Sequence, residues 1–326
     1  MKEKQTNRYY WLDIAKSIGI FLIVFGHLSI SKFTMDFLWT FHVPLFFFIS
    51  GFLFKPTAGD IFLNRLKSRL ILPYIYIYLI NALLVVLIKF DFNINSIIAM
   101  VLGLFWGSPG YSHFVNGALW FLPALIIVEL IYFFLIRKSN WFYLPLLSLS
   151  IFFYSQGYRN LFLSIDLALV GLNYYIAGVL VRKFNIIGTF KTKPVMLMLV
   201  FVLSLLVTLK FADWGNVWYA GKFYLTSLTG GILGIIMVIS LSLLLETYLK
   251  SSSFIAFISA NTLFIFCFHR FSKPLVSSVI DAFIMPSLLS SLLVATLSIL
   301  ILIPVNILVI KYLPQIIGIK KLPPDH

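Results

Sequence analysis

Residues 11–27 read WLDIAKSIGIFLIVFGH, an apolar segment that nevertheless carries Asp13, Lys16 and His27. Apolar runs of roughly 18 to 25 residues, the length that a helix needs to cross a bilayer, recur along the chain. Hydrophobic residues make up 61% of the 326 residues and charged residues only 11%. A soluble domain does not need so much apolar surface. The sequence therefore predicts an all-α, polytopic transmembrane helical bundle, organised as a single integral membrane domain over residues 1–326.

The basic residues predict how the chain crosses the membrane. When the N-terminus is placed in the cytoplasm, most Lys and Arg residues fall in cytoplasmic segments, so we expect both termini there. This bias, rather than nucleic-acid binding, explains the net charge of +14. The segment 95–106 is too short for a comfortable crossing and predicts a re-entrant or interfacial helix within an outer connection, 90–117. About ten spans are expected, near residues 12–30, 37–54, 71–89, 118–136, 141–155, 162–181, 194–211, 223–246, 254–271 and 284–310.

The polar residues of the first span share one helix face. On an α-helix, Asp13, Lys16 and His27 fall within roughly 60° of one another, and Lys16 and His27 are separated by about 16 Å of rise. Because a charge at membrane depth costs several kcal/mol, each of these residues needs a partner or a function. A purely structural alternative is an ion pair between Asp13 and Lys16, with a core histidine bonded to a carbonyl group. Their shared face favours a functional site.

Histidines gather at one predicted depth. His27, His42, His113 and His269 all fall on the outer half of the predicted topology, and the fifth histidine is the C-terminal residue. Any one of them is a plausible core residue, but four at one level indicate a site where neutral imidazoles handle protons. The single cysteine excludes an internal disulfide and a thiolate metal cluster, and we expect no metal site.

The inner side carries a different chemistry. Arg65 and Arg69 lie one turn apart just before the third span, where they either anchor the helix at lipid head groups or bind phosphates. Glu129, in the fourth span, either pairs with a cation such as Lys16 or braces helices through hydrogen bonds. Ser50 and Gly51 indicate a close-packing point between helices rather than a nucleophile. P-loop, dinucleotide-binding, zinc-protease and nucleophile-elbow motifs are absent.

Five blocks resemble one known family. Residues 11–27, with Asp13 in an L-D-x-x-[RK] segment and Lys16 eleven positions before His27, resemble the opening signature of the acyltransferase-3 family of integral membrane acyltransferases. The similarity is closest to the branch of fucose 4-O-acetylases and related polysaccharide O-acetyltransferases. The fourth span departs from the family's Ser-Leu-x-x-Glu element, so no role is carried over to Glu129. The other blocks are FHVPLFFFISGFLF (41–54), NRLKSRLILPY (64–74), ALWFLPALIIVELIY (118–132) and FIFCFHRF (264–271).

The resemblance implies an O-acyltransferase, most simply an O-acetyltransferase, in a bacterial inner membrane. The implied donor is cytoplasmic acetyl-CoA or another acyl-CoA, used as a co-substrate with no bound cofactor. The implied acceptor is a sugar hydroxyl of a surface or lipid-linked glycan. The candidate site residues then have separate roles toward the donor and the acceptor. Asp13, Lys16 and His27 are expected to be catalytic, Arg65 and Arg69 to bind the donor, and His42, His113 and His269 to bind the acceptor or stabilise an oxyanion. Glu129 is a further candidate for the acceptor end, as a buried carboxylate and not through the resemblance.

Two functions of other classes compete with this one. A secondary transporter for a glycolipid or small solute would use Asp13 and His27 in a proton relay. A non-catalytic assembly partner in polysaccharide export would need no reactive residue. The lack of a detectable internal repeat and the separation of the Arg and His clusters by depth favour the enzyme.

Overall fold

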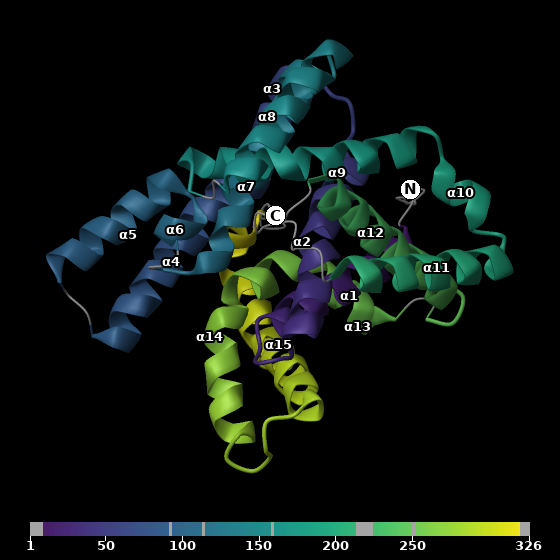
Figure 1. Cartoon of the computed structure of the whole chain (residues 1–326). Coiled ribbons are helices and arrows are strands. Elements are labelled where there is room, and N and C mark those ends of the chain that lie inside the picture. The colour runs from purple at the N-terminus through teal and green to yellow at the C-terminus, as the bar shows by residue number, and fades with distance from the viewer. Residues whose placement is uncertain are drawn as a thin grey trace, which may run out of the picture.

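The computed structural model describes residues 9–90, 93–112, 115–157, 160–212, 224–249 and 252–319, and within these ranges its regular structure is helical with no strand (Figure 1). The prediction of an all-α architecture is confirmed for this part of the chain. The α-helices are α1 (Tyr10–Gly26), α2 (Lys32–Leu53), α3 (Gly59–Leu66), α4 (Leu72–Lys89), α5 (Ile94–Trp106), α6 (Pro109–Ser112), α7 (Phe121–Ile131), α8 (Tyr143–Gln156), α9 (Ile165–Lys183), α10 (Ile186–Phe190), α11 (Pro194–Ala212), α12 (Tyr224–Glu246), α13 (Ser253–Ala260), α14 (Thr262–Ile280) and α15 (Leu288–Tyr312).

Seven helical stretches of the described chain are long and apolar enough to cross a membrane. Each overlaps a predicted span. The other three predicted spans also coincide with helices, namely α1, α8 and α11, which are not among these seven. The number of ten spans and the cytoplasmic position of the termini stay predictions. The seven are Lys32–Leu53, Gly59–Lys89, Gly117–Ile136, Phe162–Lys183, Tyr224–Glu246, Thr262–Ile280 and Leu288–Tyr312.

One predicted span is wrong in its bounds. The expected helix 254–271 is interrupted at Asn261, where α13 ends and α14 begins. Asn261 donates from its side-chain amide to the Phe257 carbonyl at 2.7 Å, a local bond that competes with regular helix. Beyond the break, α14 continues past Pro274 to Ile280, so His269 lies inside this helix and not at its end.

The short helix predicted in the outer connection is present as α5, which has 13 residues. Two tyrosines of α4 hold it. The Tyr74 hydroxyl donates to the Leu104 carbonyl at 2.7 Å, and the Tyr78 hydroxyl donates to the Met100 carbonyl at 2.8 Å. The helix therefore packs on protein along one side, and its depth in the membrane stays a prediction.

The helix pair at the centre of the core is α2 with α9, and α1 and α12 pack against α2 from other sides. Glycines allow the central pair to approach closely. A Cβ atom at Gly51 would collide with the carbonyl group of Tyr175, and one at Gly178 would collide with that of Phe48. The close-packing role predicted for Gly51 is thus confirmed, in the manner of small residues between membrane helices.

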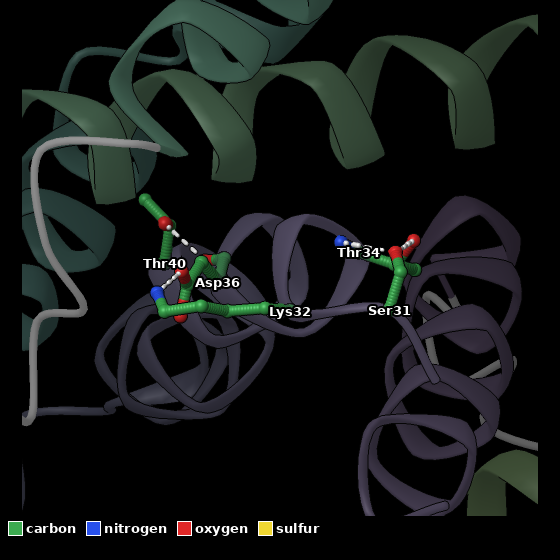
Figure 2. A network of polar contacts seen from close by, with 5 residues as sticks. All are labelled: Ser31, Lys32, Thr34, Asp36 and Thr40. Carbon is green, nitrogen blue, oxygen red and sulfur yellow. Dashed lines mark hydrogen bonds and ion pairs between the residues drawn. The ribbon is translucent and has the colours of Figure 1, made fainter. Parts of the chain in front are cut away.

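A polar network fixes the beginning of α2 (Figure 2). The Ser31 hydroxyl caps the helix by accepting from the Thr34 backbone N–H at 3.2 Å. Lys32 pairs with Asp36, and the Thr40 hydroxyl donates to the Asp36 carbonyl at 2.8 Å. Because the link from α1 to α2 is short and this end is capped, the last turn of α1 and the first turns of α2 lie at the same level.

Candidate active site

The face of α1 that carries the polar residues is turned toward the protein interior. Asp13 is buried and accepts a hydrogen bond of 2.6 Å from the Ser259 hydroxyl of α13. Lys16, one turn further along α1, is half-buried in the wall of a cavity of about 200 Å³, which we call the lysine cavity. A buried carboxylate held by a donated hydrogen bond is a stable arrangement at this depth. The structure thus brings Asp13 together with α13, a contact that no local pattern indicated.

His27 follows the last residue of α1 and lies among aromatic rings. Its imidazole stacks on that of His269, with ring centroids 5.1 Å apart and an interplanar angle of 23°. Trp39 meets it edge-on at 5.9 Å and also donates from its indole N–H to the Gly26 carbonyl at 3.1 Å. The Lys273 ammonium donates to the His27 carbonyl at 2.6 Å. Three helices, α1, α2 and α14, therefore fix the position of His27.

Hydrogen bonds determine the tautomers of the other two described histidines. His42 Nδ1 lies 2.5 Å from the Leu38 carbonyl oxygen, and His269 Nδ1 lies 2.7 Å from that of Phe266. A carbonyl oxygen only accepts, so Nδ1 carries the hydrogen in both rings. In the neutral form Nε2 is then a proton acceptor. In these neutral tautomers neither ring has a second N–H to offer to an oxyanion, and the roles expected of His42 and His269 stay predictions.

His27 and His42 share the wall of a cavity of about 420 Å³, which we call the histidine cavity. This volume falls in the range of small-molecule sites, roughly 300 to 1,000 Å³. His269 is fully buried behind His27, with no hydrogen-bond partner for Nε2 among the described residues. His113 lies outside the described residues. Among the described residues, the wall consists of Ile23, His27, Trp39, His42, Val43, Pro109, Gly110, Gly117, Ala118, Trp120, Asn160, Leu167, Phe266 and Arg270.

Arg65 and Arg69 line a third space of about 470 Å³, the arginine cavity. Glu129 lies in the same wall. Glu129 thus shares a wall with the two arginines and is not among the described residues of the histidine cavity, and its role at the acceptor end stays a prediction. In the part of the chain that the structure describes, this wall is formed by Ser50, Leu53, Phe54, Lys55, Thr57, Phe62, Arg65, Leu66, Arg69, Leu70, Leu125, Glu129 and Tyr175.

The three cavities follow one another along the helices. Ile23, Val43 and Phe266 line both the histidine and the lysine cavity. Four other residues, Ser50, Leu53, Leu70 and Leu125, line both the lysine and the arginine cavity. The first helix shows the same order. Lys16 lines the lysine cavity, Ile23 lies in the shared wall, and His27, directly after α1, lines the histidine cavity. The lysine cavity therefore lies between an anion-binding end and an imidazole end.

Asn116 is a site residue that the sequence reasoning missed. It is buried, and its side-chain amide donates to the Asn81 side chain at 2.9 Å and to the Cys267 carbonyl at 2.8 Å. Its oxygen accepts from the Ala118 backbone N–H at 3.1 Å. These bonds tie α4 and α14 to the segment 117–120, which forms part of the histidine cavity. The two asparagines, Asn81 and Asn116, lie among mostly apolar residues in the sequence, and this pattern could have indicated that their side chains bond to each other.

The described residues define an integral membrane protein whose helices enclose a series of cavities with basic residues at one end and imidazoles at the other. No group of three or more His, Cys, Asp or Glu residues in this part of the chain is arranged to hold a metal ion. A family model described as an acyltransferase domain matches residues 9–311. The chain therefore belongs to the acyltransferase-3 family and is a membrane acyltransferase. No curated protein and no solved structure matches it significantly.

Proposed function

We propose that the protein transfers an acyl group, in the simplest case acetyl, from coenzyme A to a hydroxyl group of a surface or lipid-linked glycan in a bacterial inner membrane. The observation that carries this proposal is the order of the three cavities, which share walls from Arg65 and Arg69 to His27 and His42. A donor with phosphates at one end and a thioester at the end of a long arm matches that order.

The donor's anionic end fits the arginine cavity, where Arg65, Arg69 and Lys55 supply positive charge. A guanidinium group binds phosphate oxygens through two parallel hydrogen bonds, which a lysine does not reproduce. The arm then extends past Lys16, whose ammonium group can donate to the arm's carbonyl oxygens. The thioester then reaches the wall shared by the lysine and histidine cavities, which lies between Lys16 and His27. These two residues are separated by about 16 Å of helix rise.

The histidine cavity supplies the proton chemistry. The acceptor hydroxyl oxygen attacks the thioester carbonyl carbon, the bond from carbon to sulfur breaks, and the hydroxyl proton passes to an imidazole nitrogen and then to the leaving thiolate. We assign His27 as this base, because its ring lies in the cavity wall and is held from three helices. His42 presents Nε2 as an acceptor and orients the sugar hydroxyl through a hydrogen bond.

The test is acyl transfer by the purified full-length protein, with radiolabelled acetyl-CoA and a panel of candidate glycans. We expect His27→Ala to lower kcat by about 10²- to 10⁴-fold, the usual contribution of a general base. Trp141→Ala, at an exposed aromatic side chain outside the three cavities, is the control and should retain full activity. Full activity of His27→Ala would overturn the catalytic assignment. Solute accumulation in proteoliposomes without acyl transfer would show a transporter instead.

A further inference from the structure

Arg270 of α14 has no part in the reaction described above, yet it lies in the wall of the histidine cavity. It carries the only permanent charge among the described residues of that wall, which include no Asp or Glu. It takes no part in the ion pairs between Lys32 and Asp36 and between Lys191 and Glu246. The side chain is also exposed. The cavity therefore contains a guanidinium group that no carboxylate of the described chain neutralises.

The position of Arg270 along α14 separates it from the donor. Leu263 lines the lysine cavity, Phe266 lines both the lysine and the histidine cavity, and Arg270 lines the histidine cavity alone. Arg270 lies four residues after Phe266, the residue of α14 in the shared wall, which corresponds to about 6 Å of helix rise. It thus lies beyond the point where the thioester arrives, on the side where the acceptor binds.

A second cation reinforces the charge at this end. Lys273, three residues after Arg270 on the same helix, donates to the His27 carbonyl and so remains beside the cavity. The indole side chains of Trp39 and Trp120 belong to the same wall, and the apolar side of a sugar ring packs well against an indole ring. A sugar with a negative charge complements this combination better than a neutral one.

We propose that the acceptor is an anionic sugar whose carboxylate or phosphate group binds Arg270, which places a neighbouring hydroxyl between His27 and His42. The inference rests on the proposed function and adds the chemical class of the acceptor. The guanidinium group forms two parallel hydrogen bonds with either anion, so it orients the sugar as well as attracting it. A phospholipid head group offers the same phosphate chemistry, and the experiment separates the two sources.

The experiment measures binding of matched sugars to the full-length protein in uncharged detergent by saturation-transfer NMR. Glucuronate is compared with its methyl ester, which keeps the ring hydroxyls but lacks the charge, and glucose 1-phosphate is compared with methyl glucoside. We expect at least one anionic sugar to bind about 10- to 100-fold more tightly than its neutral counterpart, as a charge-assisted hydrogen bond predicts. Arg270→Gln should abolish this preference, and Arg270→Lys should retain part of it.

The control is Lys89→Gln, which removes a positive charge from an exposed position outside the three cavities and should leave the preference unchanged. Equal binding of charged and neutral sugars, binding of neither, or a preference that survives in Arg270→Gln would overturn the inference. The inference would also be overturned if the protein bound phosphatidylglycerol through Arg270 and showed no preference for anionic sugars. That result would assign Arg270 to lipid binding. Acetyl-CoA binding, measured on the same samples, shows separately whether the donor part of the proposed function holds.

Discussion

The tie made by Asn116 offers a test of how the histidine cavity is held. Its side chain takes part in three hydrogen bonds, to Asn81, Cys267 and Ala118. Hydrogen bonds contribute about 1 kcal/mol each in soluble proteins, and side-chain bonds between membrane helices average roughly 0.6 kcal/mol. Replacing Asn116 with Ala should therefore lower the free energy of unfolding by about 2 to 3 kcal/mol.

The assay is reversible unfolding in mixed micelles by titration with SDS, carried out on Asn116→Ala, Asn81→Ala and the double variant. We expect a coupling energy of about 0.5 to 1.5 kcal/mol, because each single variant removes the same bond between the two side chains. Asn95→Ala, at an exposed position on α5, is the matched control and should change the free energy of unfolding by less than about 0.5 kcal/mol. Additive effects of Asn81→Ala and Asn116→Ala, or a loss at Asn116 no larger than that of the control, would refute the reasoning.

Three further predictions follow from other contacts. Arg65→Ala and Arg69→Ala should raise the KM for acetyl-CoA more than the KM for the acceptor, and equal effects on both constants would show that the arginines only anchor the helix. Gly51→Ala should destabilise the fold by about 1 to 3 kcal/mol through overpacking between α2 and α9, measurable in the same SDS titration; a neutral effect would contradict the close approach. Ser259→Ala should lower the free energy of unfolding by about 1 to 3 kcal/mol because it removes a hydrogen-bond donor to the buried Asp13 carboxylate, and an unchanged free energy of unfolding would show that this hydrogen bond contributes nothing.

The class of protein could be predicted from the sequence because hydropathy and helical periodicity are local properties. The apolar runs indicated membrane-spanning helices, and seven of the predicted spans overlap helices long enough to cross. The spacing of Lys16 and His27 placed both on one face of the first helix, and the two side chains do line neighbouring cavities. The family could be predicted for the same reason, since its opening signature lies within one short stretch of the chain, residues 11–27.

Local breaks were harder to predict than helices. Asn261 looked like one more residue of a continuous span, and only the packed structure shows α13 and α14 separating there. A single asparagine is tolerated within many helices, because its side chain can also bond to its own helix or to water. Whether it ends a helix depends on what the two segments pack against, and the hydropathy profile does not contain that information.

The sequence by itself determined that the chain is a helical membrane protein of the acyltransferase-3 type, with costly polar residues on the face of its first helix. Only the tertiary structure decided which distant residues complete the site. His269 stacks on His27, Lys273 reaches the His27 carbonyl across 246 positions of sequence, and Asn116 ties α14 to the cavity wall. The physical reason is that these contacts depend on how helices pack against one another, and many packings satisfy the same pattern of apolar and polar residues.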